Sequence, residues 1–384
     1  MIRPMNEKMS GGSSSAKDEG SGHGQSHDLR RTIVNDFKKG DILESLRHDF
    51  KELYSFYIDS ETRKRLESEK RVKRFFHASW YLLRSLILKL TPARRFLLLV
   101  SIAFFLFGDA SISDKNFHVS IHNNIISYFL LLLVLMLELK DKLLAHDELQ
   151  IGRTVQRALL PDTNPTLAGW SIWMFTRPAN DVGGDLVDYI NLDSERLGIA
   201  LGDVAGKGLG AALLMSKLQS TLRAIAPEYN SLSELGERTN LIFCRDSLPN
   251  RFATLVYLEL LQNSGKVRLL NAGHLPPMVL HGSDIREIPR GSPALGLMKT
   301  SKFQEQEVEL NPGDLLLAYS DGVTEARNER DEFFGDQRLN SIIRKSTGIS
   351  PEKVGEKILY EVDMFVGDAP RSDDLSLVII KRWG

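Results

Sequence analysis

The sequence predicts an α+β protein in which antiparallel sheets covered by helices follow a helical N-terminal region. Two observations predict this fold class. From about residue 163 onward, short β-type runs occur in groups, and helical runs separate those groups. Before residue 163, apolar residues recur at three- and four-residue steps or form longer uninterrupted stretches, which is typical of helices.

The C-terminal region, residues 163–384, is expected to form one domain. Its β-type runs are Trp170–Phe175, Arg196–Leu201, Ala253–Leu260, Lys266–Asn271, Pro277–His281, Asp314–Ser320 and Leu375–Ile380. Its helical runs are Gly210–Ile225, Ser231–Cys244, Gln337–Ile342 and Lys353–Phe365. No internal repeat is present in the sequence, so a repeat array is not expected.

The composition excludes several classes of protein. Across 384 residues, 49 Lys and Arg balance 50 Asp and Glu, for a net charge of −1. A protein that binds the nucleic-acid backbone carries a basic surplus, so no nucleic-acid partner is expected. The single cysteine, Cys244, excludes an internal disulfide framework and argues against a thiolate zinc site.

The N-terminal region divides into two parts by polarity. Residues 1–30 contain almost no large apolar side chain, so they cannot bury enough surface to offset the entropy of ordering, and we expect a disordered tail. Residues 31–90 are highly charged, and apolar residues such as Leu46 and Phe50 recur at helical spacing. This pattern predicts an amphipathic helical region.

Residues 91–137 contain two uncharged stretches, Phe96–Gly108 and Val119–Leu137. A membrane-spanning helix needs about 20 mostly apolar residues, so we expect a two-helix membrane hairpin, with a pair of buried core helices as the alternative. Lys and Arg residues precede the first stretch and follow the second, and the positive-inside rule therefore places both ends in the cytoplasm. The predicted location is the inner (cytoplasmic) membrane, with the C-terminal domain in the cytoplasm.

Residues 138–162 are expected to form a linker helix that Pro161 ends. One face of this helix carries an apolar stripe of Leu144, Ile151, Val155 and Leu159. Such a stripe packs on a partner helix or on the next domain, and pairing through residues 138–160 would make a homodimer. No Gly/Ser linker follows, so a rotation of the helix is expected to reach the C-terminal domain and to bias its metal occupancy.

Four aspartates share a common context, because each lies beside a predicted strand. They are Asp185 in VGGDLVD, Asp203 in LGDVAGKG, Asp321 in YSDGVTE and Asp373 in RSDDLSLVII. Carboxylates without a neighbouring His or Cys are hard oxygen donors, which suit Mg²⁺ or Mn²⁺ better than zinc. A single Asp-Gly is more often a turn than a ligand, so the metal-site interpretation depends on all four together.

The ordered motifs VGGDLVD, GDVAGKG, NAGHLPP, YSDGVTEARN and SDDLSLV resemble those of the bacterial PPM-type (protein phosphatase 2C-like) serine/threonine phosphatases of the RsbU/SpoIIE group. The resemblance covers about residues 150–384 and no part of residues 1–135. It implies an αββα sandwich with two central antiparallel sheets. It also implies two divalent cations, Mn²⁺ or Mg²⁺, at one edge of that sandwich.

Motif matching extends the resemblance to individual positions. The implied metal ligands are Asp185, Asp203, the Val204 carbonyl, Asp321 and Asp373, with Asp203 bridging the two ions. Asp374 is implied to orient its loop rather than to bind metal. Eukaryotic members of the wider family carry Glu and His where this chain has Gly184 and Ala205, so the group that protonates the leaving serine is unassigned.

Further supporting positions stay open between two interpretations. Lys207 either contacts the substrate phosphate or is only solvated. Asn271 and His274 brace the loop beside the metal site by hydrogen bonds, or His274 donates a proton. Arg177 is a candidate phosphate-binding residue, although a surface role is equally consistent with its sequence context.

The resemblance implies a hydrolase, specifically a metal-dependent protein serine/threonine phosphatase. Its catalytic residues, Asp185, Asp203, Asp321 and Asp373, would hold cations that activate water for attack on phosphoserine or phosphothreonine. The implied substrate is a phosphorylated regulatory protein of the anti-anti-sigma type. The alternative is a membrane-anchored scaffold or sensor with a degenerate phosphatase domain, and the intact set of four aspartates argues against it.

Overall fold

The computed structural model describes residues 71–106, 109–114, 117–248 and 250–383. The chain divides into two compact units, Met1–Glu138 and Leu139–Gly384, and the boundary falls inside helix α6 (Asn123–Leu159). The predicted disordered tail and residues 31–70 of the predicted amphipathic region lie outside the described residues.

The described part of the first unit consists of helices and one hairpin. Its elements are α4 (Arg71–Lys89), α5 (Pro92–Leu106), β1 (Asp109–Asp114), β2 (Phe117–His122) and the first part of α6. α5 is tied to α6 by buried serines: Ser101 Oγ donates to the Ser127 carbonyl at 2.9 Å, and Ser127 Oγ donates to the Ser101 carbonyl at 2.8 Å. This reciprocal pair fixes the packing of the two helices.

The predicted membrane hairpin over residues 91–137 is wrong. Residues 119–122 belong to strand β2, so the helical part of the second apolar stretch begins only at Asn123. α5 has 15 residues, about 22 Å of helix, whereas the hydrocarbon core of a bilayer is about 30 Å thick. Among the described helices, none combines the length and the apolar character that crossing a membrane requires, which also overturns the predicted membrane location.

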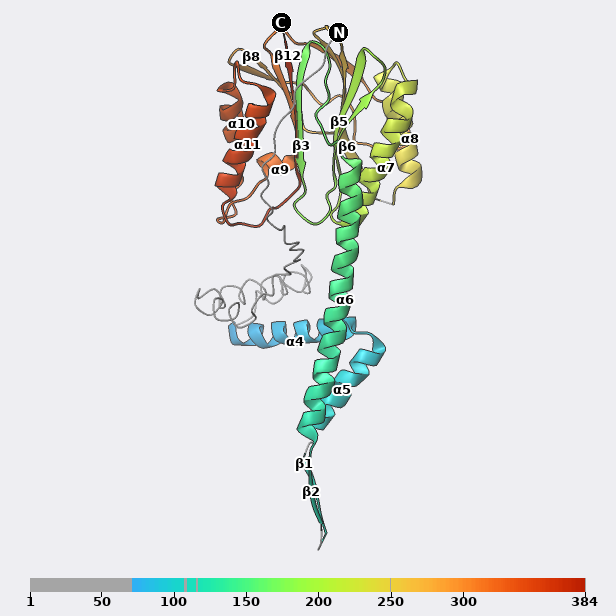
Figure 1. Cartoon of the computed structure of the whole chain (residues 1–384), viewed down its shortest axis with the longest axis vertical. Coiled ribbons are helices and arrows are strands. Elements are labelled where there is room, and N and C mark those ends of the chain that lie inside the picture. Colours follow the sequence, from blue (N-terminus) through green and yellow to red (C-terminus); the bar gives the residue numbers. More distant parts are fainter. Residues whose placement is uncertain (1–70, 107–108, 115–116, 249, 384) are drawn as a thin grey trace, which may run out of the picture. The chain divides into compact units, whose positions relative to one another are not determined.

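The second unit contains two five-stranded antiparallel sheets that pack face to face (Figure 1). The first sheet, in spatial order, is β10 (Glu305–Glu309), β7 (Lys266–Ala272), β6 (Ala253–Leu261), β5 (Arg196–Val204) and β4 (Asp185–Asn191). The second sheet, in spatial order, is β3 (Trp170–Arg177), β12 (Leu375–Arg382), β11 (Leu315–Tyr319), β8 (Met278–His281) and β9 (Asp284–Glu287).

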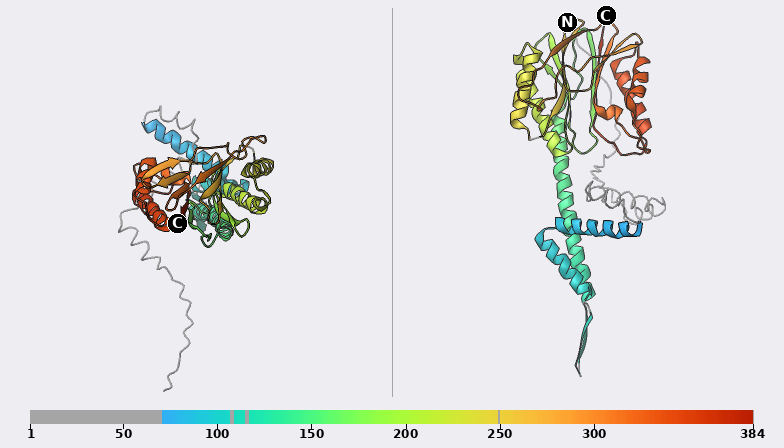
Figure 2. Two further views of the ribbon diagram at one scale, coloured as in Figure 1. Left: turned by 90° about the horizontal axis from the view of Figure 1, so that it is seen from above. Right: turned by 180° about the vertical axis from the view of Figure 1, so that it is seen from behind.

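Helices cover the outer face of each sheet, as Figures 1 and 2 show from opposite sides. The first sheet is covered by α7 (Leu209–Ile225) and α8 (Leu232–Asp246), which are joined by the 3-10 turn Ala226–Glu228. The second sheet is covered by α10 (Gly335–Arg344) and α11 (Pro351–Val366). The predicted α+β class is confirmed, and the four layers have the αββα order that the resemblance implied.

The core of the second unit lies in three layers, one between the sheets and one under each helical pair. On α7, Met215, Leu218 and Leu222 recur at helical spacing and are fully buried against the first sheet. β5 is buried on both faces, which explains its nearly continuous apolar sequence. This packing fixes the strands against one another, and the strand ends and short loops on one side of the sandwich carry the predicted site residues.

Candidate active site

Asp185 and Asp203 lie opposite each other on neighbouring antiparallel strands. Asp185 is the first residue of β4 and Asp203 is the last but one of β5, so both carboxylates lie at the same end of the first sheet. The backbone is close here, because a Cβ on Gly184 would lie 3.2 Å from the Val204 carbonyl oxygen and 3.4 Å from Asp203 Oδ1. A glycine therefore lets the Asp185 strand approach the Asp203 strand.

Asp321 and Asp373 lie beside neighbouring strands of the second sheet. Asp321 comes two residues after β11 ends and begins the short helix α9 (Asp321–Thr324), while Asp373 stands two residues before β12. β11 and β12 run antiparallel, so the end of the first meets the start of the second. A Cβ on Gly322 would collide with the Asp374 carbonyl oxygen, which shows how closely the two segments pass.

Asp374 joins the two sheets at this edge. Its Oδ1 accepts from the Ala179 amide at 2.7 Å and its Oδ2 from the Gly184 amide at 2.6 Å. Its backbone carbonyl accepts from Ser320 Oγ at 3.1 Å. Because the Gly184 amide precedes Asp185 and Ser320 precedes Asp321, these bonds bring the four aspartates of both sheets into one acidic cluster.

The cluster has excess negative charge in a partly buried setting. Burial, followed by repulsion from Asp321 and Asp373, raises the pKa of Asp203 to about 7. Burial, followed by repulsion from Asp203, raises the pKa of Asp185 well above its ordinary value. The pKa of Asp321 is raised by burial and then by Asp373. Each shift means that a neighbouring positive charge would be favourable here.

The donors present fit divalent cations such as Mg²⁺ or Mn²⁺. They are carboxylate and carbonyl oxygens, which hard cations prefer. Oδ2 of Asp185 is buried and has no hydrogen-bond partner among the described residues, which is costly unless a ligand satisfies it. Within the described ranges, however, no three Asp, Glu, His or Cys side chains already form a ready-made metal site, so the fit rests on donor chemistry.

Lys207 lies at the rim of the acidic cluster. Its Nζ is 3.1 Å from Asp373 Oδ2 and donates to the Ser372 carbonyl at 2.8 Å. Arg177, the other candidate for phosphate binding, instead forms a two-pronged ion pair with Asp363 of α11, at 2.6 and 2.9 Å. The structure therefore brings Lys207 to the aspartates and engages Arg177 elsewhere.

Asn271 and His274 lie behind the cluster. The His274 amide donates to Asn271 Oδ1 at 2.8 Å, which closes the turn after β7. His274 Nε2 donates to the Tyr319 carbonyl at 3.1 Å, since a carbonyl only accepts, and Nδ1 then accepts from Thr254 Oγ1 at 2.7 Å. Burial lowers the pKa of His274 to about 4, so the ring is uncharged at neutral pH. It joins Thr254 of β6, which pairs with Asp203, to Tyr319, two residues before Asp321.

Gln156 of α6 contacts the loop before Asp185, and the sequence pattern did not predict this contact. Its Nε2 donates to the Gly183 carbonyl at 2.7 Å, and the Gly183 amide donates back to its Oε1 at 3.0 Å. The side chain is buried, and the end of α6 is further held by Gln219 and Arg223, which donate to the Leu159 carbonyl. Helical periodicity marked only the apolar stripe, and no signal in one sequence identifies a buried glutamine as a partner of Gly183.

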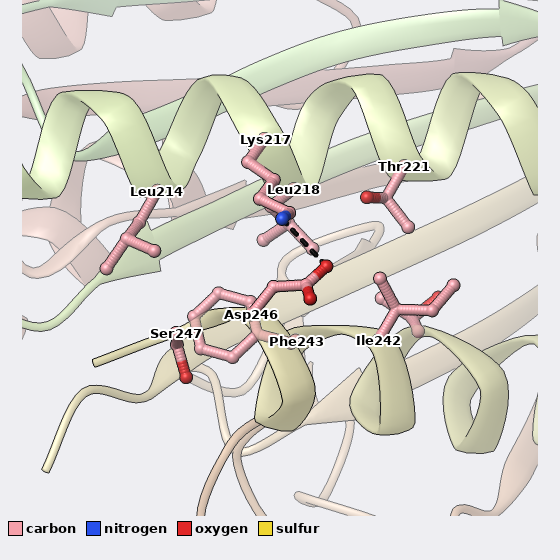
Figure 3. Close-up of a pocket in the computed structure, with 9 residues that line it drawn as sticks. Leu214, Lys217, Leu218, Thr221, Ile242, Phe243, Asp246 and Ser247 are labelled. Atoms are coloured by element: carbon pink, nitrogen blue, oxygen red, sulfur yellow. Dashed lines mark ion pairs between the residues drawn. The ribbon is translucent and has the colours of Figure 1, made fainter. Parts of the chain in front are cut away.

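A small cavity between α7 and α8 is separate from the acidic cluster (Figure 3). Its volume is about 10 Å³, enough for one water molecule. Apolar side chains line most of it, and the ion pair of Lys217 with Asp246, at 2.7 Å, lies beside it. It is too small for an organic ligand.

Comparisons with known proteins show which proteins the C-terminal region is similar to. Residues 193–383 match the family model of stage II sporulation protein E (SpoIIE). Protein IcfG of Synechocystis sp. (strain ATCC 27184 / PCC 6803 / Kazusa) is 29% identical over 61% of this chain, which spans 41% of that protein. Phosphoserine phosphatase RsbU of Bacillus subtilis (strain 168) is 25% identical over 61% of this chain and 70% of its own length.

The solved structures support the fold. The SiaA-PP2C domain of Pseudomonas aeruginosa superposes with a TM-score of 0.56 and 20% identity, over 64% of this chain and 99% of that domain. The chain spans less than half the length of Protein IcfG. The family model matches residues 193–383 and so concerns the C-terminal domain. These comparisons confirm the resemblance read from the motifs: the C-terminal domain belongs to the PP2C-like phosphatases of the SpoIIE family, the group that includes RsbU.

Proposed function

We propose that this protein is a metal-dependent serine/threonine phosphatase that removes phosphate from a regulatory protein. The acidic cluster carries the proposal, because Asp185, Asp203, Asp321 and Asp373 come from four strand ends and meet at one edge of the sandwich. The orphaned buried oxygen of Asp185 supports it further. Repulsion among the carboxylates makes the edge a site where cations would lower the free energy.

The proposed metal ligands are the four aspartates and the Val204 carbonyl, which would hold two divalent cations, Mn²⁺ or Mg²⁺. When bound, such ions lower the pKa of nearby water and offset the negative charge on a phosphoryl group. Asp374 holds the Gly184 amide and Ser320 in place, so it positions the segments that carry Asp185 and Asp321. Lys207 lies close enough to the cluster to contact a phosphate there.

No side chain of the site acts as a nucleophile in this proposal. Cys244 lies on α8, where its Sγ donates a weak hydrogen bond to Asn240 Oδ1 at 3.6 Å. His274 is uncharged and engaged through both ring nitrogens, so it braces the site and does not transfer a proton. Water is left as both the attacking group and the proton source for the leaving serine.

The proposed substrate is a phosphoserine-containing regulatory protein of the anti-anti-sigma type. This part of the proposal is supported by the likeness to RsbU, which is named a phosphoserine phosphatase. The experiment is to incubate the full chain and Mn²⁺ with a phosphoserine peptide, a phosphotyrosine peptide and p-nitrophenyl phosphate. Release of phosphate from the phosphoserine peptide and from p-nitrophenyl phosphate, but not from phosphotyrosine, is expected. If neither the phosphoserine peptide nor p-nitrophenyl phosphate releases phosphate, the proposed phosphatase activity is contradicted and a scaffold role is favoured.

We further propose that two copies of the chain pair through the apolar stripe of α6. Leu144, Ile151 and Val155 are each more than half exposed in the structure, although they are apolar. A rotation of α6 on pairing would reach the loop before Asp185 through the two hydrogen bonds between Gln156 and Gly183.

If two copies pair through this stripe, charged substitutions on it should prevent the pairing. Ile151→Lys with Val155→Lys places two charges on the stripe and should convert a dimer into a monomer in light scattering. Tyr360→Lys on α11 is the matched control, because Tyr360 is 63% exposed and lies outside the stripe. A double variant that keeps the dimer mass would show that the stripe is not the contact.

A further inference from the structure

Three loops lie side by side next to Asp203. The Ala205 amide, just after β5, donates to the Phe252 carbonyl at 2.9 Å, and an Arg251 guanidinium nitrogen donates to the Ala205 carbonyl at 2.8 Å. Ala253 and Leu295 exchange backbone hydrogen bonds at 2.8 and 2.9 Å. These bonds join the loop after Asp203 to the segment before β6, and that segment to the loop that begins at Leu295.

Four large apolar side chains are exposed on these loops and form what we call the apolar rim. They are Leu248, Phe252, Leu297 and Met298, with exposed fractions of 65%, 39%, 55% and 60%. A single exposed apolar residue is ordinary on a protein surface. Four of them on neighbouring loops joined by hydrogen bonds are more than scattered single residues, and gathered apolar exposure of this kind marks interaction sites.

The rim is continuous with the acidic cluster through the first sheet. β5 and β6 pair in a register that places Asp203 opposite Thr254 and Val204 opposite Ala253. Phe252 directly precedes β6, and its carbonyl accepts a hydrogen bond from the amide of Ala205, which lies two residues after Asp203. A protein that brings a phosphoserine to Asp203 therefore has the rim loops close at hand.

Basic residues accompany the rim. Arg251 and Lys299 form no ion pair within the described part of the chain, and the one side-chain hydrogen bond of Arg251 there goes to a neutral carbonyl. The guanidinium lies over Gly206, where a Cβ would collide with it, so the glycine makes room for the charge. Arg251 and Lys299 therefore bring two positive charges to the side of the rim, while the acidic cluster itself is negative.

We propose that the apolar rim docks the phosphorylated protein substrate. It would bind apolar residues close to the phosphoserine, with Arg251 and Lys299 facing acidic residues of the same segment. This inference rests on the proposed phosphatase function and adds the chemistry by which the substrate is recognised. Such a surface distinguishes a protein from a small phosphate ester, because only the protein reaches the rim.

The test compares two phosphoserine decapeptides with p-nitrophenyl phosphate. One peptide carries leucine and aspartate beside the phosphoserine, and the other carries glycine and serine. The unchanged protein should show a kcat/KM about tenfold higher for the first peptide, since burial of one or two apolar side chains is worth about that factor. Leu248→Ser with Met298→Ser should remove this preference and leave p-nitrophenyl phosphate hydrolysis within about twofold.

Tyr360→Ser with Met364→Ser on α11 is the matched control, because these side chains are 63% and 65% exposed on the opposite helical layer. This variant should keep the peptide preference. A rim variant that also keeps the preference, with normal p-nitrophenyl phosphate hydrolysis, would overturn the docking surface alone. A rim variant that instead changes from dimer to monomer would overturn it in favour of self-association. Failure of all hydrolysis in the unchanged protein would contradict the proposed function itself.

Discussion

Replacing Asp203 with asparagine is expected to lower kcat by about a thousandfold or more. Asp203 lies opposite Asp185 and is repelled by both Asp321 and Asp373, so it is the carboxylate that all parts of the cluster share. Asparagine keeps the shape but removes the charge that would hold a cation, and several kcal/mol of transition-state stabilisation would be lost. Asp321→Asn should have an effect of the same order. Steady-state kinetics with p-nitrophenyl phosphate and Mn²⁺ measure both.

The same substitution should stabilise the metal-free protein. The pKa of Asp203 is raised to about 7 in the fold, so keeping its carboxylate charged at pH 8 costs free energy, on the order of a few kcal/mol. This cost is complete above about pH 7, shrinks steadily as the pH falls below 7 and is lost only near the ordinary pKa of 3.8, where the unfolded chain is protonated too. Asparagine never carries it. Without metal at pH 8, Asp203→Asn should therefore unfold at a higher temperature than the unchanged protein, and the difference should shrink toward pH 5.

Asp284→Asn is the control for both measurements, because Asp284 is exposed on β9 and lies outside the cluster. It should change neither kcat nor the unfolding temperature. Near-normal turnover in Asp203→Asn or in Asp321→Asn would show that the ligand assignment is wrong.

Removal of divalent cations is expected to reduce activity to background. In the proposed mechanism no side chain of the described residues acts as the nucleophile, so hydrolysis depends on cations held by the carboxylates. Dialysis against EDTA should abolish phosphate release, and added Mn²⁺ should restore it. N-ethylmaleimide, which alkylates Cys244, should leave activity unchanged provided that circular dichroism shows an intact fold. Activity that survives chelation, or that alkylation removes from folded protein, would contradict the metal-dependent mechanism.

The apolar strands and amphipathic helices were largely predictable from the sequence, whereas strands whose charged side chains form ion pairs with other elements were not. β5 and β12 read as apolar runs because both faces of each strand are buried. β4 was not predicted, since Asp188 interrupts its pattern. In the structure Asp188 is buried and paired with Arg223 of α7, which is 35 residues away, and one sequence does not reveal that partner.

Strand β10 was missed for a related reason. Its sequence, EQEVE, has hardly any apolar residues. Glu305 and Glu307 instead pair with Arg268 and Lys266 of the neighbouring strand β7. Cross-strand ion pairs of this kind become visible only when the partner strand and its register are known. The sequence therefore indicated the centre of the first sheet better than its edges.

The membrane prediction failed because composition does not locate the start of a helix. The stretch from Val119 to Leu137 is uncharged throughout, but its first residues form a strand of the β1–β2 hairpin and only the remainder is helical. For the active site, the order of the aspartates along the sequence identified the acidic residues of the site. The role of Gln156 could not be predicted from the sequence, because polar residues on helices usually face solvent.

The paired hydrogen bonds between Gln156 and Gly183 limit which N-terminal regions evolution can attach to this domain. A carboxamide satisfies both the backbone amide and the backbone carbonyl of one residue, Gly183, whereas the neighbouring side chains, Val155 and Arg157, lack one or both of the required groups. An insertion or deletion within α6 turns the upstream residues about the helix axis relative to Gln156, by about 100° per residue. If α6 transmits a signal as proposed, N-terminal regions exchanged by recombination upstream of it should retain coupling when the helix length changes by about 7 or 11 residues, and lose it when the change is 2 or 5. Natural variation in the length of this helix would then be quantised, even where its sequence has diverged completely.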